Sequence, residues 1–186
     1  YLEKLPLVAR EFGYRDGSEW ESSCRLIQEF YEKANKIAQL HLLSKTRFIF
    51  RKKSASRLTN YYSSGKKFDG FCVKNGFLSA QHPQIFEECP VRLIRVFRYL
   101  QRLKVQLAPD LLKLLIEKGQ SDLCPSTTRN SEANDVFMAI LSESGNVYPV
   151  LAQMNACRIL SKILPEFNHA DKHLSAQIYH RYTTGL

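Results

Sequence analysis

Three histidines near the end of the sequence have a spacing that could support chemistry. His169 and His173 are four residues apart, and His180 follows seven residues later. On one helix this spacing places all three near one face, as metal ligands would lie. No glutamate stands in the general-base position of an HExxH motif, and no cysteine pair is near them. We therefore expect solvated histidines, and we predict neither a metal site nor a cofactor.

A cysteine beside two carboxylates is the next candidate for chemistry. Cys89 follows Glu87 and Glu88, and His82 is close in the sequence. A nucleophilic cysteine needs a lowered thiol pKa, whereas adjacent carboxylates raise it. The stretch 64–67 lacks the first glycine and the spacing of a phosphate-binding loop. The sequence therefore predicts no catalytic residues and a protein that is not an enzyme.

The strongest signal is a run of positive charge. Residues 45–67 hold eight Lys or Arg residues and no acidic residue, within a chain of net charge +9. Phe48, Phe50, Tyr61, Tyr62 and Phe68 are interleaved with these cations. Cations displace counterions from a phosphate backbone, and aromatic rings stack on unpaired bases. The alternatives are an acidic protein partner or a solvated surface whose aromatic residues face the core.

A second group of cations follows Pro90. Arg92, Arg95, Arg98 and Arg102 share one broad face of a predicted helix, which strengthens the nucleic-acid interpretation only if both basic regions adjoin in space. The predicted nucleic-acid-binding residues are Lys45, Arg47, Arg51, Lys52, Lys53, Arg57, Lys66, Lys67, Arg92, Arg95, Arg98 and Arg102.

The elements that must position these residues are mainly helical. Ser18 to Glu21 has the pattern of a capping box, and the following apolar positions alternate at four and three residues, which predicts a helix over 18–43. A short helix over 1–12 precedes it and ends at Gly13. Further helices are predicted over 90–105, over 110–118 with Pro109 at its start and Gly119 as its C-cap, from Ser131 or Asn134 to 144, over 149–163 and from about His169.

The stretch 44–83 has no clear period, and three glycines and a proline interrupt it. Short extended pieces at 48–50 and 71–73, a helix over 54–62 and a small hairpin are predicted there. Phe97 precedes Pro109 by 12 residues, and Phe137 precedes Pro149 by 12, so two helical pairs repeat at an offset of 40. The predicted fold is mainly all-α, with HEAT-like or solenoid-like stacked helical hairpins and an irregular basic insert at about 44–83.

The stretch from Ser54 to Tyr99 resembles the C-terminal helical domain of the SMC-complex localisation factor family. The similar residues are Ser54-Ala55, Gly65-Lys66, Phe71, Asn75–Ala80, Cys89-Pro90-Val91, Leu93 and Phe97-Arg98. The resemblance implies a HEAT-like domain that pairs with a second helical subunit and recruits a structural-maintenance-of-chromosomes complex to chromatin or to damaged DNA. No catalytic residues follow from it.

Residues 1–186 are therefore expected to form a single helical interaction domain, taken as a piece of a longer chain because the sequence starts at Tyr1. The expected function is that of a non-catalytic scaffold or adaptor, in the nucleus or cytoplasm, that binds a second helical subunit and could also bind DNA. The alternative is a helical-repeat, pentatricopeptide-like module that binds RNA. No membrane association is expected, because no apolar run approaches the roughly 20 residues of a membrane span.

Overall fold

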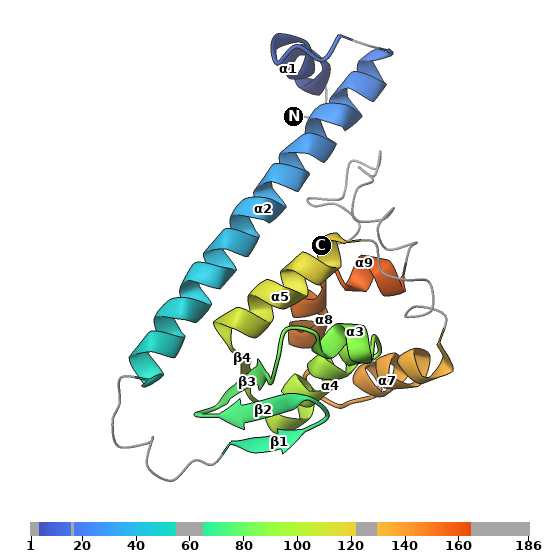
Figure 1. The fold of residues 1–186 in the computed structure, drawn as a ribbon. Helices are drawn as coiled ribbons and strands as arrows, with labels where there is room; N and C mark the ends of the chain where they lie inside the picture. Colours follow the sequence, from blue (N-terminus) through green and yellow to red (C-terminus); the bar gives the residue numbers. More distant parts are fainter. Residues whose placement is uncertain (1–3, 16, 55–64, 122–129, 165–186) are drawn as a thin grey trace. The chain divides into compact units, whose positions relative to one another are not determined.

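The computed structural model describes residues 4–15, 17–54, 65–121 and 130–164 (Figure 1). The chain is mainly helical, as expected, but it also contains a small mixed sheet. The helices are α1 (Leu5–Glu11), α2 (Glu19–Ser54), α3 (Ile85–Glu88), α4 (Arg92–Leu103), α5 (Pro109–Gln120), α7 (Ser131–Leu141), α8 (Val147–Ala156) and α9 (Leu160–Ile163). The strands are β1 (Lys66–Phe68), β2 (Phe71–Lys74), β3 (Phe77–Ala80) and β4 (Gln106–Leu107). None of the helices in the described part is both long and apolar enough to cross a membrane.

The chain divides into two compact units. Unit 1 comprises Tyr1–Ala38 and Leu164–Leu186, and unit 2 comprises Gln39–Ile163. In unit 1, the capping box predicted at Ser18 is confirmed. The Ser18 backbone N–H donates to Glu21 Oε2 at 2.8 Å, and the Glu21 N–H donates to Ser18 Oγ at 3.3 Å. The predicted end of the first helix is also confirmed, since α1 stops before Gly13, whose φ is +90°.

The long helix α2 starts where the sequence predicts and continues past the predicted end at Leu43 to Ser54. The expected extended piece at 48–50 is therefore wrong. In unit 2, Leu42, Thr46 and Ile49 recur at spacings of four and three, which is the helical period that the dense positive charge obscures. The predicted helix over 54–62 falls almost wholly outside the described residues.

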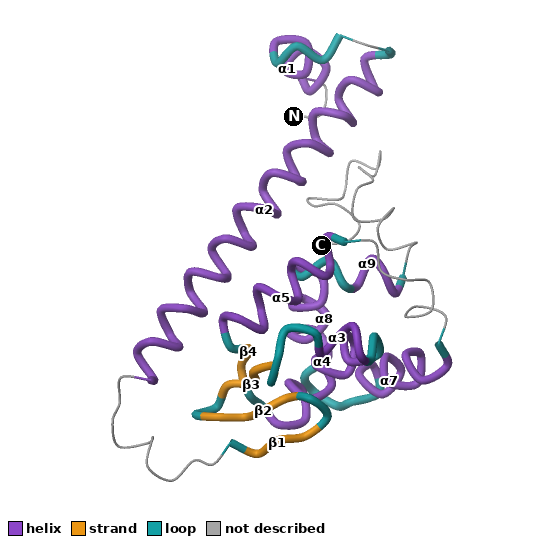
Figure 2. The backbone as a smooth tube through the Cα atoms, viewed as in Figure 1, coloured by secondary structure: helices purple, strands orange, loops and turns teal. Residues whose placement is uncertain are grey.

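Three strands of the sheet occupy residues 66–80, within the irregular insert expected at about 44–83. Its strand order is β1-β2-β3-β4, with antiparallel pairs β1–β2 and β2–β3 and a parallel pair β3–β4 (Figure 2). Asp69-Gly70 and Asn75-Gly76 form the two hairpin turns, and all four residues have φ between +44° and +78°. Positive φ at both central residues is typical of the tight hairpin turn that Asn-Gly and Asp-Gly favour. The glycines thus mark tight turns, and the predicted hairpin is confirmed.

The two faces of the sheet pack on different helices. Phe71 on β2 lies edge-on to Tyr99 of α4, with ring centroids 5.8 Å apart. Phe77 on β3 lies edge-on to Phe50 of α2, with centroids 5.0 Å apart. Phe77 pairs with Lys74 on β2, so the side chains of these two residues lie on the same face of the sheet. Lys74 is three residues after Phe71, and side chains alternate along a strand, so Phe71 and Phe77 lie on opposite faces. The sheet therefore separates α4 from the C-terminal part of α2.

The helices of unit 2 close a core around this sheet. Its fully buried members include Phe71, Phe77, Leu78, Ile85, Ile94, Phe97, Leu111, Leu112, Leu115, Ile140, Met154 and Ile159. Gly119 lies inside α5, which continues to Gln120, so the predicted C-cap is wrong. A Cβ at this position would stand 1.8 Å from the carbonyl oxygen of Cys157. The role of Gly119 is to let the end of α5 approach the backbone after α8. The helix predicted over 149–163 is two helices, α8 and α9, which are separated around Arg158 with φ +59°.

Candidate functional site

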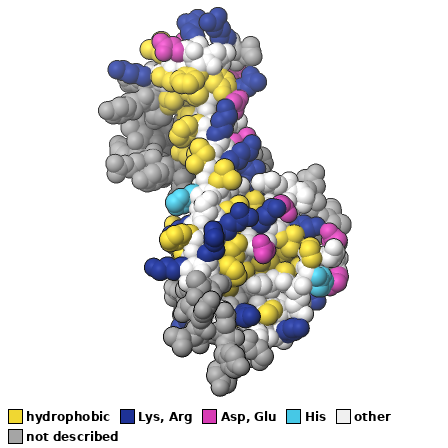
Figure 3. Space-filling model, turned by 60° about the vertical axis from the view of Figure 1, so that its left-hand side comes forward, with side chains coloured by type: hydrophobic (Ala, Val, Ile, Leu, Met, Phe, Trp, Pro, Cys, Tyr) yellow, Lys and Arg dark blue, Asp and Glu magenta, His cyan; other side chains and the backbone are white. Residues whose placement is uncertain are grey.

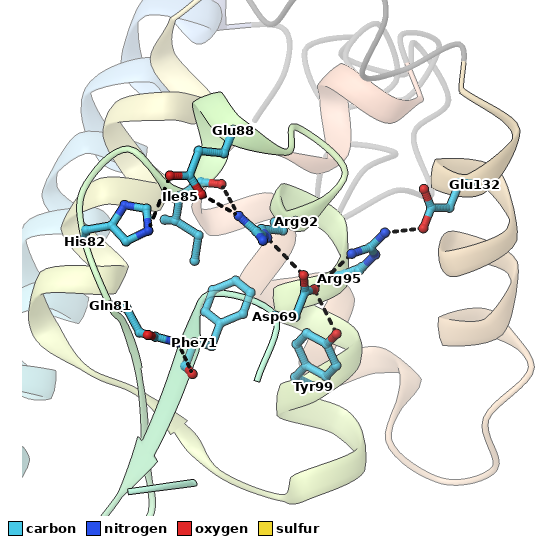
Figure 4. A network of polar contacts seen from close by, with 10 residues as sticks. All are labelled: Asp69, Phe71, Gln81, His82, Ile85, Glu88, Arg92, Arg95, Tyr99 and Glu132. Carbon is cyan, nitrogen blue, oxygen red and sulfur yellow. Dashed lines mark hydrogen bonds and ion pairs between the residues drawn. The ribbon is translucent and has the colours of Figure 1, made fainter. Parts of the chain in front are cut away.

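The most elaborate polar arrangement in unit 2 starts at the first hairpin turn. Asp69 has φ +44° and is followed by Gly70 with φ +78°, so the turn directs the Asp69 carboxylate toward α4 (Figure 4). The backbone N–H of Gln81 donates to the Gly70 carbonyl at 2.9 Å, and its side-chain amide donates to the Phe71 carbonyl at 3.1 Å. These bonds fix the turn against the end of β3.

Three donors on one face of α4 converge on the Asp69 carboxylate. Arg92 Nε donates to Oδ1 at 3.0 Å, while an Arg95 terminal nitrogen at 3.0 Å and the Tyr99 hydroxyl at 2.9 Å donate to Oδ2. The spacing of three and four residues is the spacing that aligns side chains along a helix. The side chains of Arg92, Asp69 and Arg95 are only 17%, 20% and 23% exposed, so these are partly desolvated ion pairs.

Each arginine of this group also bridges to a second element. Arg92 donates to Glu88 at 3.1 Å and to the Ile85 carbonyl at 3.1 Å, both in α3. Arg95 donates to Glu132 at the start of α7, and Arg98 donates to Glu143 just beyond the end of α7. The arginines of α4 therefore join the sheet, α3 and α7 into one body.

The electrostatics of this cluster keep Asp69 and Arg95 charged and the Tyr99 hydroxyl neutral. Partial burial acts to raise the pKa of Asp69, but hydrogen bonds from Arg92, Arg95 and Tyr99 outweigh it and hold the pKa below its ordinary value. Burial and the bond to Asp69 raise the pKa of Tyr99 to about 12. Burial acts to lower the pKa of Arg95, but the bonds to Asp69 and Glu132 prevail and raise it. An ionised carboxylate with a depressed pKa is a poor proton acceptor near neutral pH. The cluster is thus suited to holding the sheet, α3 and α7 against α4, and it is poorly suited to proton transfer.

The predicted nucleic-acid-binding residues fall into separate places. Arg92, Arg95 and Arg98 are paired with carboxylates, and Arg102 is exposed on α4. Lys45, Arg47, Arg51 and Lys52 are exposed on α2, and Lys67 is exposed on β1. The side chains of Lys53, Arg57 and Lys66 lie outside the described residues. Because α4 and the C-terminal part of α2 pack on different faces of the sheet, the described cations of these two helices lie on different sides of it. No contact bears on nucleic-acid binding itself, which stays a prediction.

Two other candidates can be placed only in part. His82 Nε2 lies 3.5 Å from Glu88 Oε1, so the histidine nearest Cys89 in the sequence faces a carboxylate. His169, His173 and His180 lie outside the described residues. Within the described ranges, no group of three or more His, Cys, Asp or Glu side chains is arranged to hold a metal ion.

Sequence reasoning missed the acidic half of the cluster. Asp69, Glu132 and Glu143 are 26, 37 and 45 residues from the arginines that they pair with. One signal was available, because Asp69-Gly70 stands between Phe68 and Phe71 and is a strong hairpin pattern. It places Asp69 at a turn, although it does not reveal which helix the carboxylate meets.

The fold and the cluster together define the class of protein. It is a mainly helical domain with a small mixed sheet, in which ion pairs between arginines and carboxylates connect the elements. The family described as uridylyltransferase GlnD third domain matches residues 71–163, half of the chain, and the chain belongs to this family. The match begins at β2 and ends at α9, and so spans most of the body of unit 2.

Curated relatives agree with the family. Three of them are proteins named bifunctional uridylyltransferase/uridylyl-removing enzyme. The one from Rhodopseudomonas palustris is 32% identical over 62% of this chain and 12% of its own length. Those from Ruegeria pomeroyi and Caulobacter vibrioides are 26% and 25% identical, over 95% and 96% of this chain, and each match covers 20% of the relative. The chain spans a fifth or less of the length of these relatives. No solved structure matches the chain.

These matches correct several expectations. The resemblance to the SMC-complex localisation factor family is wrong, since family and relatives are those of a uridylyltransferase. The expected function as a scaffold that acts at chromatin or at damaged DNA is wrong for the same reason. The alternative function as an RNA-binding module is wrong as well. A nuclear location is wrong because the relatives are bacterial. The expectation of a protein that is not an enzyme is also wrong, because the relatives are named as enzymes.

Proposed function

We propose that this chain works as one domain of a bifunctional enzyme that transfers and removes uridylyl groups. The observation that carries the proposal is the family match over residues 71–163, which includes the sheet from β2 onward and the helices of unit 2. Similarity to the Ruegeria pomeroyi relative over 95% of the chain extends the same assignment to α1 and α2.

The geometry of unit 2 supports a particular contribution to that enzyme. Uridylyl transfer and removal form and break a bond to phosphorus, and the reacting groups must be held in fixed positions for either step. The arginines of α4 tie three elements into one body and leave Asp69 saturated with donors. We propose that unit 2 is a rigid part against which the reacting parts of the enzyme are held.

Two finer points belong to this proposal. The first is a HEAT-like stack of the pairs α4/α5 and α7/α8, supported by the packing of α4 against both α7 and α8. The second is that residues 1–186 act together as one interaction domain that contacts a protein surface. The exposed apolar side chains Met138 and Tyr148, on α7 and α8, support this second point.

A domain exchange tests the proposed function. The segment of the Rhodopseudomonas palustris relative that matches this chain would be replaced by the corresponding part of this chain. Uridylyl transfer to that enzyme's own acceptor, and removal from it, would then be measured. Both activities should persist, because a body of the same family is in place.

The control is the same exchange with an unrelated helical domain of equal length, which should lose both activities. Circular dichroism and gel filtration would establish that each chimera is folded. A folded chimera that carries this chain and has neither activity contradicts the proposal.

A further inference from the structure

A cavity of about 180 Å³ lies within unit 2, under the C-terminal part of α2. One wall comes from α2, and the others come from β4, α5 and the end of α8. It is lined by Leu42, Lys45, Thr46, Ile49, Gln106, Leu107, Leu112, Gln153 and Cys157. Every lining residue belongs to Gln39–Ile163.

The size of the cavity limits what it can hold. An apolar protein cavity of about 150 Å³ accommodates benzene, so this one accommodates a compact organic molecule of about eight non-hydrogen atoms. Pockets for drug-sized or cofactor-sized molecules run from roughly 300 to 1,000 Å³. The cavity is thus smaller than the pockets that typically enclose a nucleotide.

The walls combine an apolar surface with one positive charge. Leu42, Ile49, Leu107 and Leu112 provide the apolar side, together with the buried thiol of Cys157. Burial raises the pKa of this thiol to about 12, so it packs as an uncharged group. Thr46, Gln106 and Gln153 supply a hydroxyl and two amides that can donate hydrogen bonds.

Lys45 is the charged residue of the lining, and it is exposed at the edge of the cavity. The lining contains no acidic residue, and no described carboxylate forms an ion pair with Lys45. Arg92 and Arg95, on the other face of the sheet, each form ion pairs with two carboxylates. Lys45 therefore differs from these arginines in having no described carboxylate as a partner. A cation beside an apolar cavity with amide donors is suited to an anion that has an apolar body.

We propose that this cavity binds a small monocarboxylate with an apolar body. The Lys45 ammonium pairs with the carboxylate, the Thr46 hydroxyl and the two amides bond its oxygens, and the hydrocarbon part lies against Leu107 and Leu112. An amino acid fits less well, because its ammonium group meets no carboxylate in the lining. Bound acid bridges α2 to α5 and α8 and holds residues 42–49 on the body of unit 2.

Calorimetric titration of the full chain with three matched probes tests this proposal. The probes are 4-methylpentanoate, 4-methylpentan-1-ol and 4-methylpentylamine, which share one apolar body and differ in the charge of the head group. The acid should bind with Kd of roughly 10 μM to 1 mM, as expected for about eight non-hydrogen atoms. The alcohol should bind at least about 10-fold more weakly, and the amine should not bind measurably.

Matched variants assign the binding to the cavity. Lys45→Met should weaken binding of the acid about 10-fold or more, whereas Lys52→Met, on the same helix outside the lining, should leave it unchanged. Thr46→Leu, which fills the cavity, should abolish binding of the acid while circular dichroism confirms the fold. Three results overturn the proposal: no saturable binding of the acid, equal binding of acid and alcohol, or unchanged affinity in Lys45→Met.

Discussion

Two groups of cations on opposite faces of one small sheet have different surroundings. The arginines of α4 point at carboxylates from the β1–β2 turn, α3 and α7. Lys45, Arg47, Arg51 and Lys52 of α2 form no ion pair with a described carboxylate, and Figure 3 shows Lys and Arg side chains gathered around this part of α2. Both groups look alike in the sequence. The comparison teaches that a run of positive charge becomes an available surface only where the fold supplies no acid.

Removal of the shared carboxylate should produce the largest effect on stability. Asp69→Asn keeps a residue that tolerates the positive φ of the turn, but it leaves Arg92 and Arg95 partly buried without their common partner. We expect a loss of about 2–3 kcal/mol in the free energy of unfolding. Urea denaturation should be followed by far-ultraviolet circular dichroism, because the single tryptophan, Trp20, lies in unit 1. A loss under about 0.5 kcal/mol, the range of ordinary surface substitutions, would contradict the stapling role.

Removal of one of the donors should cost less. Arg95→Gln loses the contacts with Asp69 and Glu132, while Arg92 and Tyr99 still donate to Asp69. The expected loss is about 1–2 kcal/mol by the same denaturation measurement. A loss as large as that of Asp69→Asn would mean that Arg95 alone carries the cluster.

The contribution of Asp69 to the free energy of unfolding should depend on pH. Its folded-state pKa is lower than the ordinary value of 3.8, so its contribution is present in full above pH 3.8 and is lost as the pH falls through the folded-state value. The stability difference between the natural chain and Asp69→Asn should thus be constant near neutral pH and shrink below pH 3.8. A difference that is unchanged at the lowest pH at which both fold would assign the effect of Asp69→Asn to the turn and not to its charge.

The smallest effect is expected on α2. Arg47→Gln and Arg51→Gln remove exposed cations that have no described partner, so each should change the free energy of unfolding by less than about 0.5 kcal/mol. A larger loss in either variant would show that the α2 cations are also structural and would remove the contrast with α4.

The sequence predicts the local features of this fold well. The capping box at Ser18, a helix that begins at Pro109, a helix that opens near Ser131 and an extended piece at 71–73 follow from short-range rules, and all are present. The last turns of α2 and the first strand were missed because positive charge and glycines suggested irregular structure. The spacing of Leu42, Thr46 and Ile49 indicates a helix, and Asp69-Gly70 indicates a hairpin turn that follows a strand.

The candidate site could be predicted only in half. Four arginines on one face of a helix are evident, but Glu132 on α7 and Glu143 just beyond its end lie tens of residues away in the sequence. Pairing at such separation depends on tertiary packing, which local pattern does not encode. The cavity beside Lys45 depends in the same way on where α5 and α8 meet α2.

A pair of double-mutant cycles, in which the stabilities of single and double variants are compared, tests the contrast most directly. One cycle joins Asp69→Asn with Arg95→Gln, and the other joins Asp69→Asn with Arg47→Gln. The first should give a coupling energy of about 1 kcal/mol or more, because the two groups share a hydrogen bond, and the second should be additive within about 0.5 kcal/mol. Equal coupling in the two cycles would contradict the claim that α4 holds structural cations and α2 holds available ones.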